Sequence, residues 1–438
     1  MRMLVVASIA AGAATDAHAA TRSDAVSAWN ANAGDAAIAA CLAPTNNPLH
    51  ESRLYAAMHL AVHDAVNAID RRSRPYAFAT RRRLPGASLD AAVAAAARDA
   101  LVMLLQQLPA PFSDCAPAAV ASVESDYATA LAAIADGPAK NEGIQLGRAA
   151  AATILAIRTG DGADTPLFDT AYRQGTAPGE YRFTPGFSFA FAPGWADVRP
   201  FALRDSAQFR AGAPYAVTTK RYAADVAEVK HLGGDGITTP SARTAEQTAI
   251  AHFWLESSPL QWNRIARTVG ARLDPWQQAR LFGLLNMAMA DGYVGSFETK
   301  YLYNYWRPVT AIREADSDGN PNTSADPTWT PLVPTPPIPD HDSAHAVEGG
   351  AAAEVLRRFF HTDRIPFRTC SLTLPAGSTC TDPSPVTRRY DSFSEAADEN
   401  GLSRILVGFH FRHAVEDGIE HGRRIGGYAV ERFLRPAR

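Results

Sequence analysis

The sequence lacks two features that would direct it to a membrane or to nucleic acid. After the N-terminus, none of its apolar runs approaches the ~20 residues that a membrane-spanning helix needs. Its charge is nearly balanced, with a formal net charge of −3 over 438 residues. Both absences argue against an anionic membrane or a nucleic acid as the main partner. The 47% of hydrophobic and 20% of charged residues are typical of a globular protein with one large core or two packed halves.

Cysteine is scarce as well, because the chain has only four. Cys370 and Cys380 bracket a short loop that contains proline and glycine, which favours a disulfide bond. Cys41 and Cys115 could form a second bond. This spacing does not suit a structural zinc site. The cysteines therefore predict a protein of an oxidising compartment.

The first twenty residues, "MRMLVVASIAAGAATDAHAA", resemble a secretory signal. They combine a basic residue, an apolar stretch of modest length and the small-x-small site Ala17-His18-Ala19. We therefore expect residues 1–19 to be a signal peptide and the mature protein to be secreted or periplasmic. The alternative is a helical or disordered N-terminus on a cytosolic protein.

Strand-like alternation is rare in this sequence, and we find no internal repeat or low-complexity segment. Apolar residues recur at helical spacing in most of the chain, notably in residues 51–70, 88–108, 117–136, 140–158, 241–258, 261–273, 274–306 and 343–360 and from about 392 to the end. Residues 161–217 and 314–342 are instead rich in glycine, proline and aromatics, which indicates long ordered loops. The fold class that we predict is all-α.

The stretch "KYLYNYWRP" places Lys300 and Arg307 seven positions apart. On one continuous helix the two cations would face the same way, roughly 10 Å apart along the axis. Two stacked cations repel each other unless an anion lies between them. The spacing therefore predicts an anion site.

The stretch "PDHDSAH" places Ser343 at the start of a predicted helix. The backbone N–H groups of Ala344 and His345 then lack acceptors inside the helix and form an anion site with the helix dipole. The imidazole of His345 can give or take a proton there. Taken alone, a helix cap beside a solvated histidine is the commoner structure.

The stretch "SRILVGFHFRHAVEDG" holds Arg404 and His410, six positions apart. One straight helix would turn them about 120° away from each other. Gly408 offers a break, so we expect Arg404 before it and His410 at the start of the last helix. Together the three stretches supply three cations, neutral donors and two imidazoles, a complete shell for a tetrahedral or trigonal-bipyramidal oxyanion.

The order Lys-x6-Arg-Pro, Ser-x-His and Ser-Arg-x5-His resembles the signature shared by vanadium-dependent haloperoxidases and type 2 phosphatidic acid phosphatases. Stretches such as "HDAVNAI", "GWADVRPF" and "MAMADGYVGSFETKYLYNYWRP" are similar to the soluble bacterial haloperoxidase branch. The likeness extends from about residue 50 to 435. It implies two packed helical bundles: an N-terminal helical half in residues 20–200 and, in residues 201–438, a C-terminal bundle that holds the oxyanion site, within one composite domain.

The resemblance also implies roles for individual residues. In that family the lysine, both arginines, the serine and the amide after it bind vanadate, and the last histidine coordinates vanadium. The histidine of Ser-x-His is the acid–base, and the lysine polarises the bound oxidant. Carried over to this chain, the vanadate ligands are Lys300, Arg307, Ser343, Ala344, Arg404 and His410, with His410 on the metal, and the catalytic residues are His345 and Lys300.

The function that the resemblance implies is oxidation of a halide ion by hydrogen peroxide to hypohalous acid or an equivalent. The expected cofactor is vanadate, although phosphate can occupy the same site. The expected partners are hydrogen peroxide, a halide ion and a small organic acceptor, and a homo-oligomer is left open. Two alternatives remain: a phosphoric monoester hydrolase of the acid-phosphatase type, with His410 as nucleophile, and a non-catalytic exported oxyanion-binding protein.

Two positions depart from the family pattern. Asp342 replaces a proline; it could lower the affinity for an oxyanion, but we expect it to cap the following helix. Ala414 replaces the aspartate four residues past the last histidine, which orients the histidine nucleophile in the phosphatases. Its loss argues against phosphatase chemistry, and a backbone carbonyl could orient His410 as a metal ligand instead.

His59, His63 and Asp64 have helical spacing that could bind zinc. Neither a third ligand nor a second shell of supporting residues is evident in the sequence. We therefore interpret them as part of a packed, hydrogen-bonded helix face.

Overall fold

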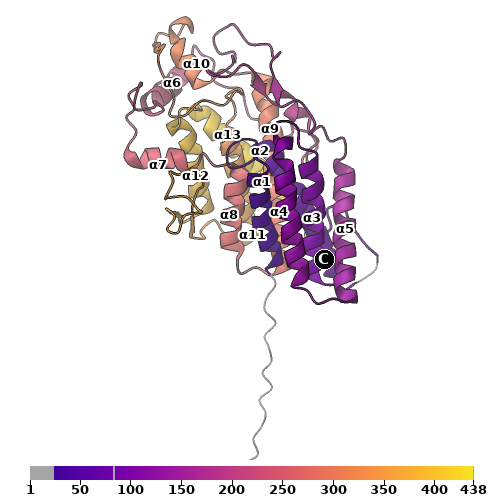
Figure 1. The fold of residues 1–438 in the computed structure, drawn as a ribbon. Helices are drawn as coiled ribbons and strands as arrows, with labels where there is room; N and C mark the ends of the chain where they lie inside the picture. Colours follow the sequence, from indigo (N-terminus) through magenta and orange to yellow (C-terminus); the bar gives the residue numbers. More distant parts are fainter. Residues whose placement is uncertain (1–23, 82–83, 438) are drawn as a thin grey trace, which may run out of the picture.

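The computed structural model describes residues 24–81 and 84–437, so the predicted signal peptide at 1–19 lies outside the described residues. The described chain is mostly helical (Figure 1), which confirms the all-α prediction. The N-terminal helices are α1 (Ala25–Ala39), α2 (Pro48–Ile69), α3 (Leu89–Gln106), α4 (Ala116–Ala132) and α5 (Pro138–Arg158). The later helices are α6 (Lys220–Leu232), α7 (Ala245–Phe253), α8 (Ser258–Gly270), α9 (Pro275–Tyr303), α10 (Pro308–Arg313), α11 (Ala344–Phe360), α12 (Phe393–Leu406) and α13 (Arg412–Arg432).

The remaining regular elements are short. Two small antiparallel pairs join β1 (Phe168–Asp169) to β2 (Ala190–Phe191) and β3 (Phe367–Thr369) to β4 (Arg388–Tyr390). Three 3₁₀ turns are η1 (Phe112–Asp114), η2 (Pro193–Asp197) and η3 (Ala315–Ser317). Residues 161–217 and 314–342 are otherwise irregular but ordered, as the sequence predicts.

The N-terminal helices pack as a bundle in which α3 lies against α2, α4 and α5 (Figure 1). The start of α3 is fixed by Ser88, whose side chain accepts a hydrogen bond from the backbone N–H of Ala91. α3 and α5 approach very closely, since a Cβ at Gly147 would lie 2.3 Å from the carbonyl oxygen of Ala92. Small residues on both helices permit this contact. The disulfide bond between Cys41 and Cys115 links the end of α1 to the start of α4.

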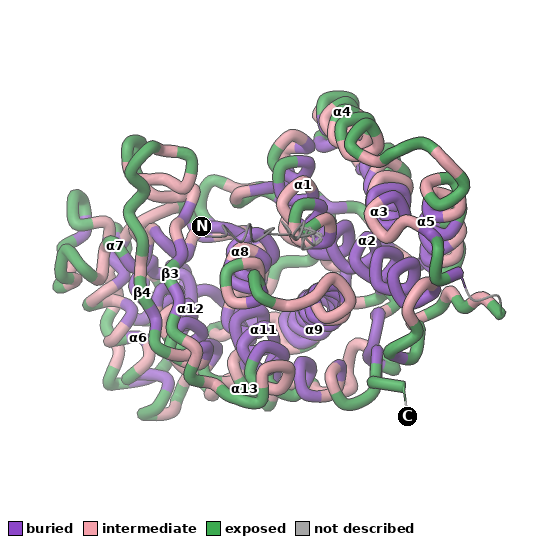
Figure 2. Tube along the Cα trace, turned by 90° about the horizontal axis from the view of Figure 1, so that it is seen from below, coloured by how far each residue is buried: buried purple, intermediate pink, exposed green. Residues whose placement is uncertain are grey.

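The C-terminal helices pack around α11, which contacts α9, α12 and α13. A Cβ at Gly422 would lie 1.9 Å from the carbonyl oxygen of Val347, so α13 can approach α11 only with glycine there. A disulfide bond joins Cys370 to Cys380 beside β3, as predicted. Figure 2 shows that α2, α9 and α11 form the buried centre of the molecule. The two sets of helices therefore share one core.

Three helices lie outside the segments predicted from the sequence, namely α1, α6 and the short α10. The sequence of α1, "AVSAWNANAGDAAIA", has small and polar residues in place of a clear apolar stripe. Its burial against the other helices, rather than its own periodicity, identifies it as part of the core. Among the described residues, no helix has both the length and the apolar character to cross a membrane.

Candidate functional site

The motif that begins with Lys300 spans two helices rather than one. α9 ends at Tyr303, and Asn304 follows in the left-handed region with a φ of 48°. α10 begins at Pro308, and Arg307 is its extended N-cap. The prediction of one continuous helix is wrong, because the residue before a proline is disfavoured in helical geometry. Two different helix ends therefore position the two cations.

Lys300 is fully buried in the last turn of α9. Its Nζ donates hydrogen bonds to the carbonyl oxygens of Pro339 and Asp340, at 3.0 and 2.9 Å. An ammonium group has three N–H donors, so its contacts within the described chain leave one for a further acceptor. Burial first, and then the charge of Arg307, lower the pKa of Lys300 to about 7 against the opposing effects of Asp342 and Asp340.

Arg307 connects the first motif to the last. Its Nε donates to the carbonyl oxygen of Ile338 at 2.7 Å, and its Nη1 donates to that of Phe409 at 2.8 Å. The same Nη1 lies 2.9 Å from Nε2 of His410. Burial first, and then the charge of Arg307, lower the pKa of His410 well below its ordinary value. The imidazole of His410 is therefore neutral, as a metal ligand must be.

Gly408 breaks the chain between Arg404 and His410, as predicted. It has a φ of 85°, which glycine adopts without strain. The backbone N–H groups of Phe409 and His410 both donate to the carbonyl oxygen of Arg404, at 3.0 and 3.2 Å. Arg404 lies in the last turn of α12, whereas His410 precedes the N-cap of α13 and is not in its first turn as expected.

The guanidinium of Arg404 is held by neutral groups. Its Nη2 donates to the carbonyl oxygen of Trp254 at 2.5 Å, and its Nε donates to the hydroxyl of Ser403 at 3.0 Å. Burial, opposed by Tyr293 and assisted by Arg307, lowers the pKa of Arg404 to about 9. The lowered value indicates a cation without full charge compensation.

Ser343 is the N-cap of α11, at the predicted helix start. Its hydroxyl is fully buried and has no hydrogen-bond partner in the described part of the chain, so it does not cap the helix. The N–H groups of Ala344 and His345, the first two helical residues, have no acceptor inside the helix. A buried hydroxyl without a partner is costly unless a ligand pairs with it. These groups form a set of neutral donors at one helix end.

His345 lies in the first turn of α11, and its Nε2 is 3.3 Å from the carbonyl oxygen of Glu256. Burial first, and then the charge of Arg404, lower the pKa of His345 well below its ordinary value. His345 is therefore neutral at ordinary pH and able to accept a proton.

Five of the seven predicted residues line one cavity of about 680 Å³, namely Arg307, Ala344, His345, Arg404 and His410. Lys300 and Ser343 lie outside its wall. The charge of Lys300 nevertheless lowers the pKa of both His345 and His410, and Ser343 directly precedes Ala344. The structure thus brings all three motif segments together.

Asp340 is a site residue that the sequence analysis missed. Its Oδ1 lies 2.9 Å from Nδ1 of His410 and 4.0 Å from Nη1 of Arg307. The contact with His410 is short but not aligned as a hydrogen bond, and neither carboxylate oxygen has an aligned donor among the described residues. Burial raises the pKa of Asp340 to about 7, although Arg307 and Lys300 oppose this. A carboxyl group, and not the expected backbone carbonyl, therefore lies beside His410.

Asp342 does not cap α11, so that interpretation is wrong. Its carboxylate accepts hydrogen bonds from Nδ1 of His421, at 2.7 Å, and from the hydroxyl of Ser296, at 2.8 Å. Burial raises the pKa of Asp342, but His421 outweighs burial and the net shift is downward. At the other departure, the carbonyl oxygen of Ala414 accepts the N–H of Ser343 at 2.9 Å. Both positions anchor the start of α11 to neighbouring helices.

The histidines of α2 belong to the core. His63 contacts Asp64 through Nδ1 at 2.9 Å and Ser73 through Nε2 at 2.8 Å. His59 contacts the side-chain amide of Asn30 at 2.7 Å. The described residues include no group of three or more histidine, cysteine or acidic side chains that could hold a metal ion. The interpretation as a packed helix face is therefore confirmed.

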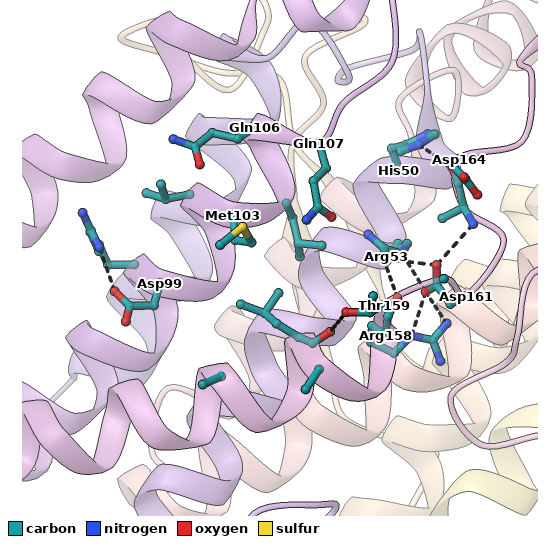
Figure 3. Close-up of a pocket in the computed structure, with 18 of the residues that line it drawn as sticks. His50, Arg53, Asp99, Met103, Gln106, Gln107, Arg158, Thr159, Asp161 and Asp164 are labelled. Carbon is teal, nitrogen blue, oxygen red and sulfur yellow. Dashed lines mark hydrogen bonds and ion pairs between the residues drawn. The ribbon is translucent and has the colours of Figure 1, made fainter.

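A second large cavity, of about 1050 Å³, lies against α3 and α5 in the N-terminal half (Figure 3). Several of its charged side chains are paired with each other. Asp161 accepts hydrogen bonds from Nε of Arg53, at 3.0 Å, and from Nε of Arg158, at 2.8 Å. Burial raises the pKa of Asp161, but Arg53 and then Arg158 outweigh it, so the net shift is downward. Arg53 and Arg158 thus share a counter-ion that the chain itself supplies.

Comparisons with known proteins agree with the motifs. The family model described as the VCPO second helical-bundle domain matches residues 280–438. A vanadium chloroperoxidase from Curvularia inaequalis is 25% identical over 236 residues, which are 41% of this chain and 38% of that protein. The aligned part is thus less than half of that relative.

Solved structures share the fold of nearly the whole chain. The structure titled the first bacterial vanadium-dependent iodoperoxidase has a TM-score of 0.76 at 22% identity, covering 95% of this chain and 97% of that one. An apo-type bacterial vanadium-dependent chloroperoxidase has a TM-score of 0.70 at 17% identity, covering 89% and 94%. Residues 280–438 therefore match the second helical-bundle domain of this family model, and nearly the whole chain has the fold of the bacterial vanadium-dependent haloperoxidases.

Proposed function

We propose that the protein is a vanadate-dependent haloperoxidase, an enzyme that oxidises a halide ion with hydrogen peroxide to hypohalous acid or an enzyme-bound equivalent. One observation carries the proposal: the three motif segments converge on one cavity, and the cations that line it or lie beside it are held by neutral groups. Lys300, Arg307 and Arg404 donate to backbone carbonyls, together with the hydroxyl of Ser403. Three cations that lack full compensation are tolerable together only around an anion.

The residues present fit vanadate as that anion. Lys300, Arg307 and Arg404 supply positive charge, and the Ser343 hydroxyl and the Ala344 amide supply neutral donors. The orphaned, buried hydroxyl of Ser343 supports this fit, because an oxyanion would accept its hydrogen bond. His410 is neutral and offers an imidazole nitrogen as the ligand to the metal.

When bound, vanadate supplies Lewis-acid activation of hydrogen peroxide. Neutral His345 would be the acid–base beside the site, accepting a proton at its imidazole from hydrogen peroxide and giving it back. Lys300 would polarise the oxidant through the one N–H donor of its Nζ that does not donate to a backbone carbonyl. The partners are then hydrogen peroxide, a halide ion and a small organic acceptor. The two disulfide bonds support a secreted or periplasmic location.

A second candidate function is hydrolysis of phosphoric monoesters. The absence of a carboxylate at Ala414 argued against it, but Asp340 supplies a carboxyl group within 2.9 Å of Nδ1 of His410. Such a group could orient His410 for attack on phosphorus. With Asp340 beside His410, the missing carboxylate at position 414 no longer argues against phosphatase chemistry.

One experiment separates these functions. Purified apoprotein is incubated with orthovanadate and assayed for bromide-dependent halogenation of a small water-soluble phenol, and the vanadate-free protein is assayed for hydrolysis of a phosphate ester. We expect halogenation that depends on vanadate and is lost in His410→Ala. Hydrolysis without halogenation would favour the phosphatase. Tight vanadate binding without either activity would indicate a non-catalytic oxyanion-binding protein.

A further inference from the structure

The turn between α7 and α8 holds two residues of the oxyanion site through its backbone. The carbonyl oxygen of Trp254 accepts the hydrogen bond from Nη2 of Arg404 at 2.5 Å. The carbonyl oxygen of Glu256 lies 3.3 Å from Nε2 of His345. Both contacts depend on the path of the main chain and not on a side chain of the turn. A shift of this turn would therefore displace a cation and the acid–base of the proposed function together.

The contact with Glu256 also decides which nitrogen of His345 carries the proton. A backbone carbonyl can only accept a hydrogen bond, so Nε2 is the protonated nitrogen of the neutral ring. Nδ1 is then the nitrogen that can accept a proton during the reaction. Neutral imidazole exists in two tautomers, so a displaced turn would no longer select one of them.

A buried ion pair holds the turn from behind. The two carboxylate oxygens of Glu256 accept hydrogen bonds from the two terminal nitrogens of Arg264 in α8, at 2.7 and 2.9 Å. The Glu256 side chain is fully buried, and that of Arg264 is 15% exposed. A two-point contact of this kind adds geometric specificity to the attraction between the charges. The ion pair therefore fixes the direction of Glu256 and, with it, the turn.

A disulfide loop contacts both members of this ion pair. The carbonyl oxygen of Cys370 accepts a hydrogen bond from Nη1 of Arg264 at 3.1 Å. The backbone N–H of Leu372 donates to Oε1 of Glu256 at 3.3 Å. The disulfide bond between Cys370 and Cys380 closes the loop that carries these two groups and restricts its conformations. The loop therefore supports the ion pair on the side away from the turn.

We propose that Glu256, Arg264 and the disulfide loop form a clamp that positions Arg404 and His345 for the reaction. None of these clamp elements lines the cavity of about 680 Å³, so Glu256 and Arg264 are positioning residues that do not touch the reactants. A misplacement of about 1 Å caused by a remote mutation can cost roughly 10²-fold in rate. The effect of the clamp on turnover rests on the proposed function, whereas the placement of the imidazole is a property of the protein without vanadate.

Two clamp variants and one control test this proposal. Arg264→Lys keeps the charge but loses the two-point contact. Glu256→Gln combined with Arg264→Met removes both charges, so neither partner is left buried and unpaired. Arg98→Gln is the matched control, because Arg98 makes a two-point contact with Glu124 in the N-terminal half. Chemical denaturation first shows that each variant is folded.

The first measurement uses the vanadate-free protein. Nitrogen-15 NMR of the histidine side chains reports the tautomer of His345, whose signal is identified by its loss in His345→Ala. We expect the form protonated at Nε2 in wild type and in Arg98→Gln. Both clamp variants should show a mixture of the two tautomers, because the carbonyl of Glu256 is no longer held against the ring.

The second measurement uses the enzyme saturated with vanadate. In both clamp variants kcat for bromide oxidation should fall by roughly 10- to 100-fold, while the KM for bromide stays close to that of wild type. The vanadate Kd should rise severalfold, since Arg404 is displaced as well. Cys370→Ser combined with Cys380→Ser only opens the loop and should lower kcat less, by severalfold. Arg98→Gln should keep the kcat of wild type.

Turnover close to that of wild type in both clamp variants would overturn the inference. A loss of turnover with the His345 tautomer and the vanadate affinity both unchanged would also overturn it, because the clamp would then serve the fold alone. An unchanged kcat in the double serine variant would overturn the role of the disulfide loop. If wild type oxidises no bromide, the proposed function fails, and the tautomer measurement still decides whether the clamp positions His345.

Discussion

Arg53 and Arg158 in the N-terminal half share the carboxylate of Asp161, whereas Arg307 and Arg404 in the C-terminal half donate to backbone carbonyls and a serine hydroxyl. Both sets are buried. In the first set one carboxylate at hydrogen-bond distance offsets part of the positive charge. In the second set the nearest carboxylate oxygen to Arg307 is that of Asp340, at 4.0 Å.

Carbonyl oxygens satisfy the N–H donors of a cation without neutralising its charge. The difference appears in the titration of the groups themselves. Burial lowers the pKa of both Arg158 and Arg404. The carboxylate of Asp161 opposes this shift at Arg158, whereas no carboxylate of the described residues opposes it at Arg404. The N-terminal cluster is thus complete in the sense that the chain supplies its counter-ion, whereas the C-terminal cluster is incomplete and, on the proposed function, takes an anion.

The largest expected effect comes from breaking the complete cluster. Asp161→Asn would leave two buried arginines without their counter-ion, so we expect the free energy of unfolding to fall by about 3–5 kcal/mol. Lys300→Met removes a cation from the incomplete cluster and should cost the apoprotein much less. Chemical denaturation of both apoproteins measures the difference. Equal losses would show that the two clusters are equivalent.

A second prediction distinguishes vanadate binding from proton transfer. His410→Ala removes the expected direct ligand, so vanadate affinity should fall by more than the about 1.5–3 kcal/mol of one charge-assisted hydrogen bond. His345→Ala should keep most of the vanadate and lose turnover by ~10²-fold or more. Equilibrium dialysis and steady-state kinetics on folded variants provide the two measurements. Unchanged vanadate affinity in His410→Ala would mean that the metal ligand is wrongly assigned.

A third prediction concerns pH. Lys300 and Asp340 both have a pKa of about 7 in the free site. As pH rises through 7, Lys300 loses its positive charge and Asp340 gains a negative one, so both changes weaken anion binding. The vanadate Kd should rise by roughly tenfold per pH unit above 7 if Lys300 must be charged. Asp340→Asn should reduce this slope, and the ratio of variant to wild-type Kd cancels the titration of vanadate itself.

The smallest effect is stabilisation by phosphate, which should supply the missing counter-charge. At about five times its Kd, phosphate should raise the free energy of unfolding of the apoprotein by about 1 kcal/mol. It should also compete with vanadate, because both are tetrahedral oxyanions. Lys300→Met should show less stabilisation, while Asp161→Asn should keep it. Stabilisation of equal size in Lys300→Met would place the phosphate elsewhere.

Much of this arrangement follows from local sequence signals. Ser343 at a helix start and Gly408 at a chain break are fixed by capping and backbone preferences within a few residues. The all-α class follows from periodicity repeated over long segments. The end of α9 was also signalled locally, because Pro308 disfavours a helix through Arg307, but the aromatic run before it gave no visible stop.

The sequence does not predict contacts between residues that are far apart in the chain. Asp342 is adjacent to the helix that it was expected to cap, yet its partner His421 lies 79 residues away. Asp340 faces His410 across a similar separation, so no spacing rule connects the two. The cavity is lined by four phenylalanines of a loop without periodicity (Phe168, Phe187, Phe189 and Phe191), and only the packing of that loop against α9 makes them part of the cavity. Local sequence preferences therefore predicted where the motifs lie, whereas tertiary packing determines which residues contact them.

The burial of α9 determines whether the two halves of the chain can fold separately. Every residue from 281 to 297 is buried, with α2 packed against this helix from one half and α11 from the other. It also fixes the loop before it, since Asp291 accepts the backbone N–H groups of Phe201 and Ala202 at 2.6 and 2.7 Å. A cut near residue 200 would therefore leave each fragment with a core face that only the other fragment covers. The two fragments should regain structure when they are mixed. Neither fragment should occur as an independent domain in other proteins.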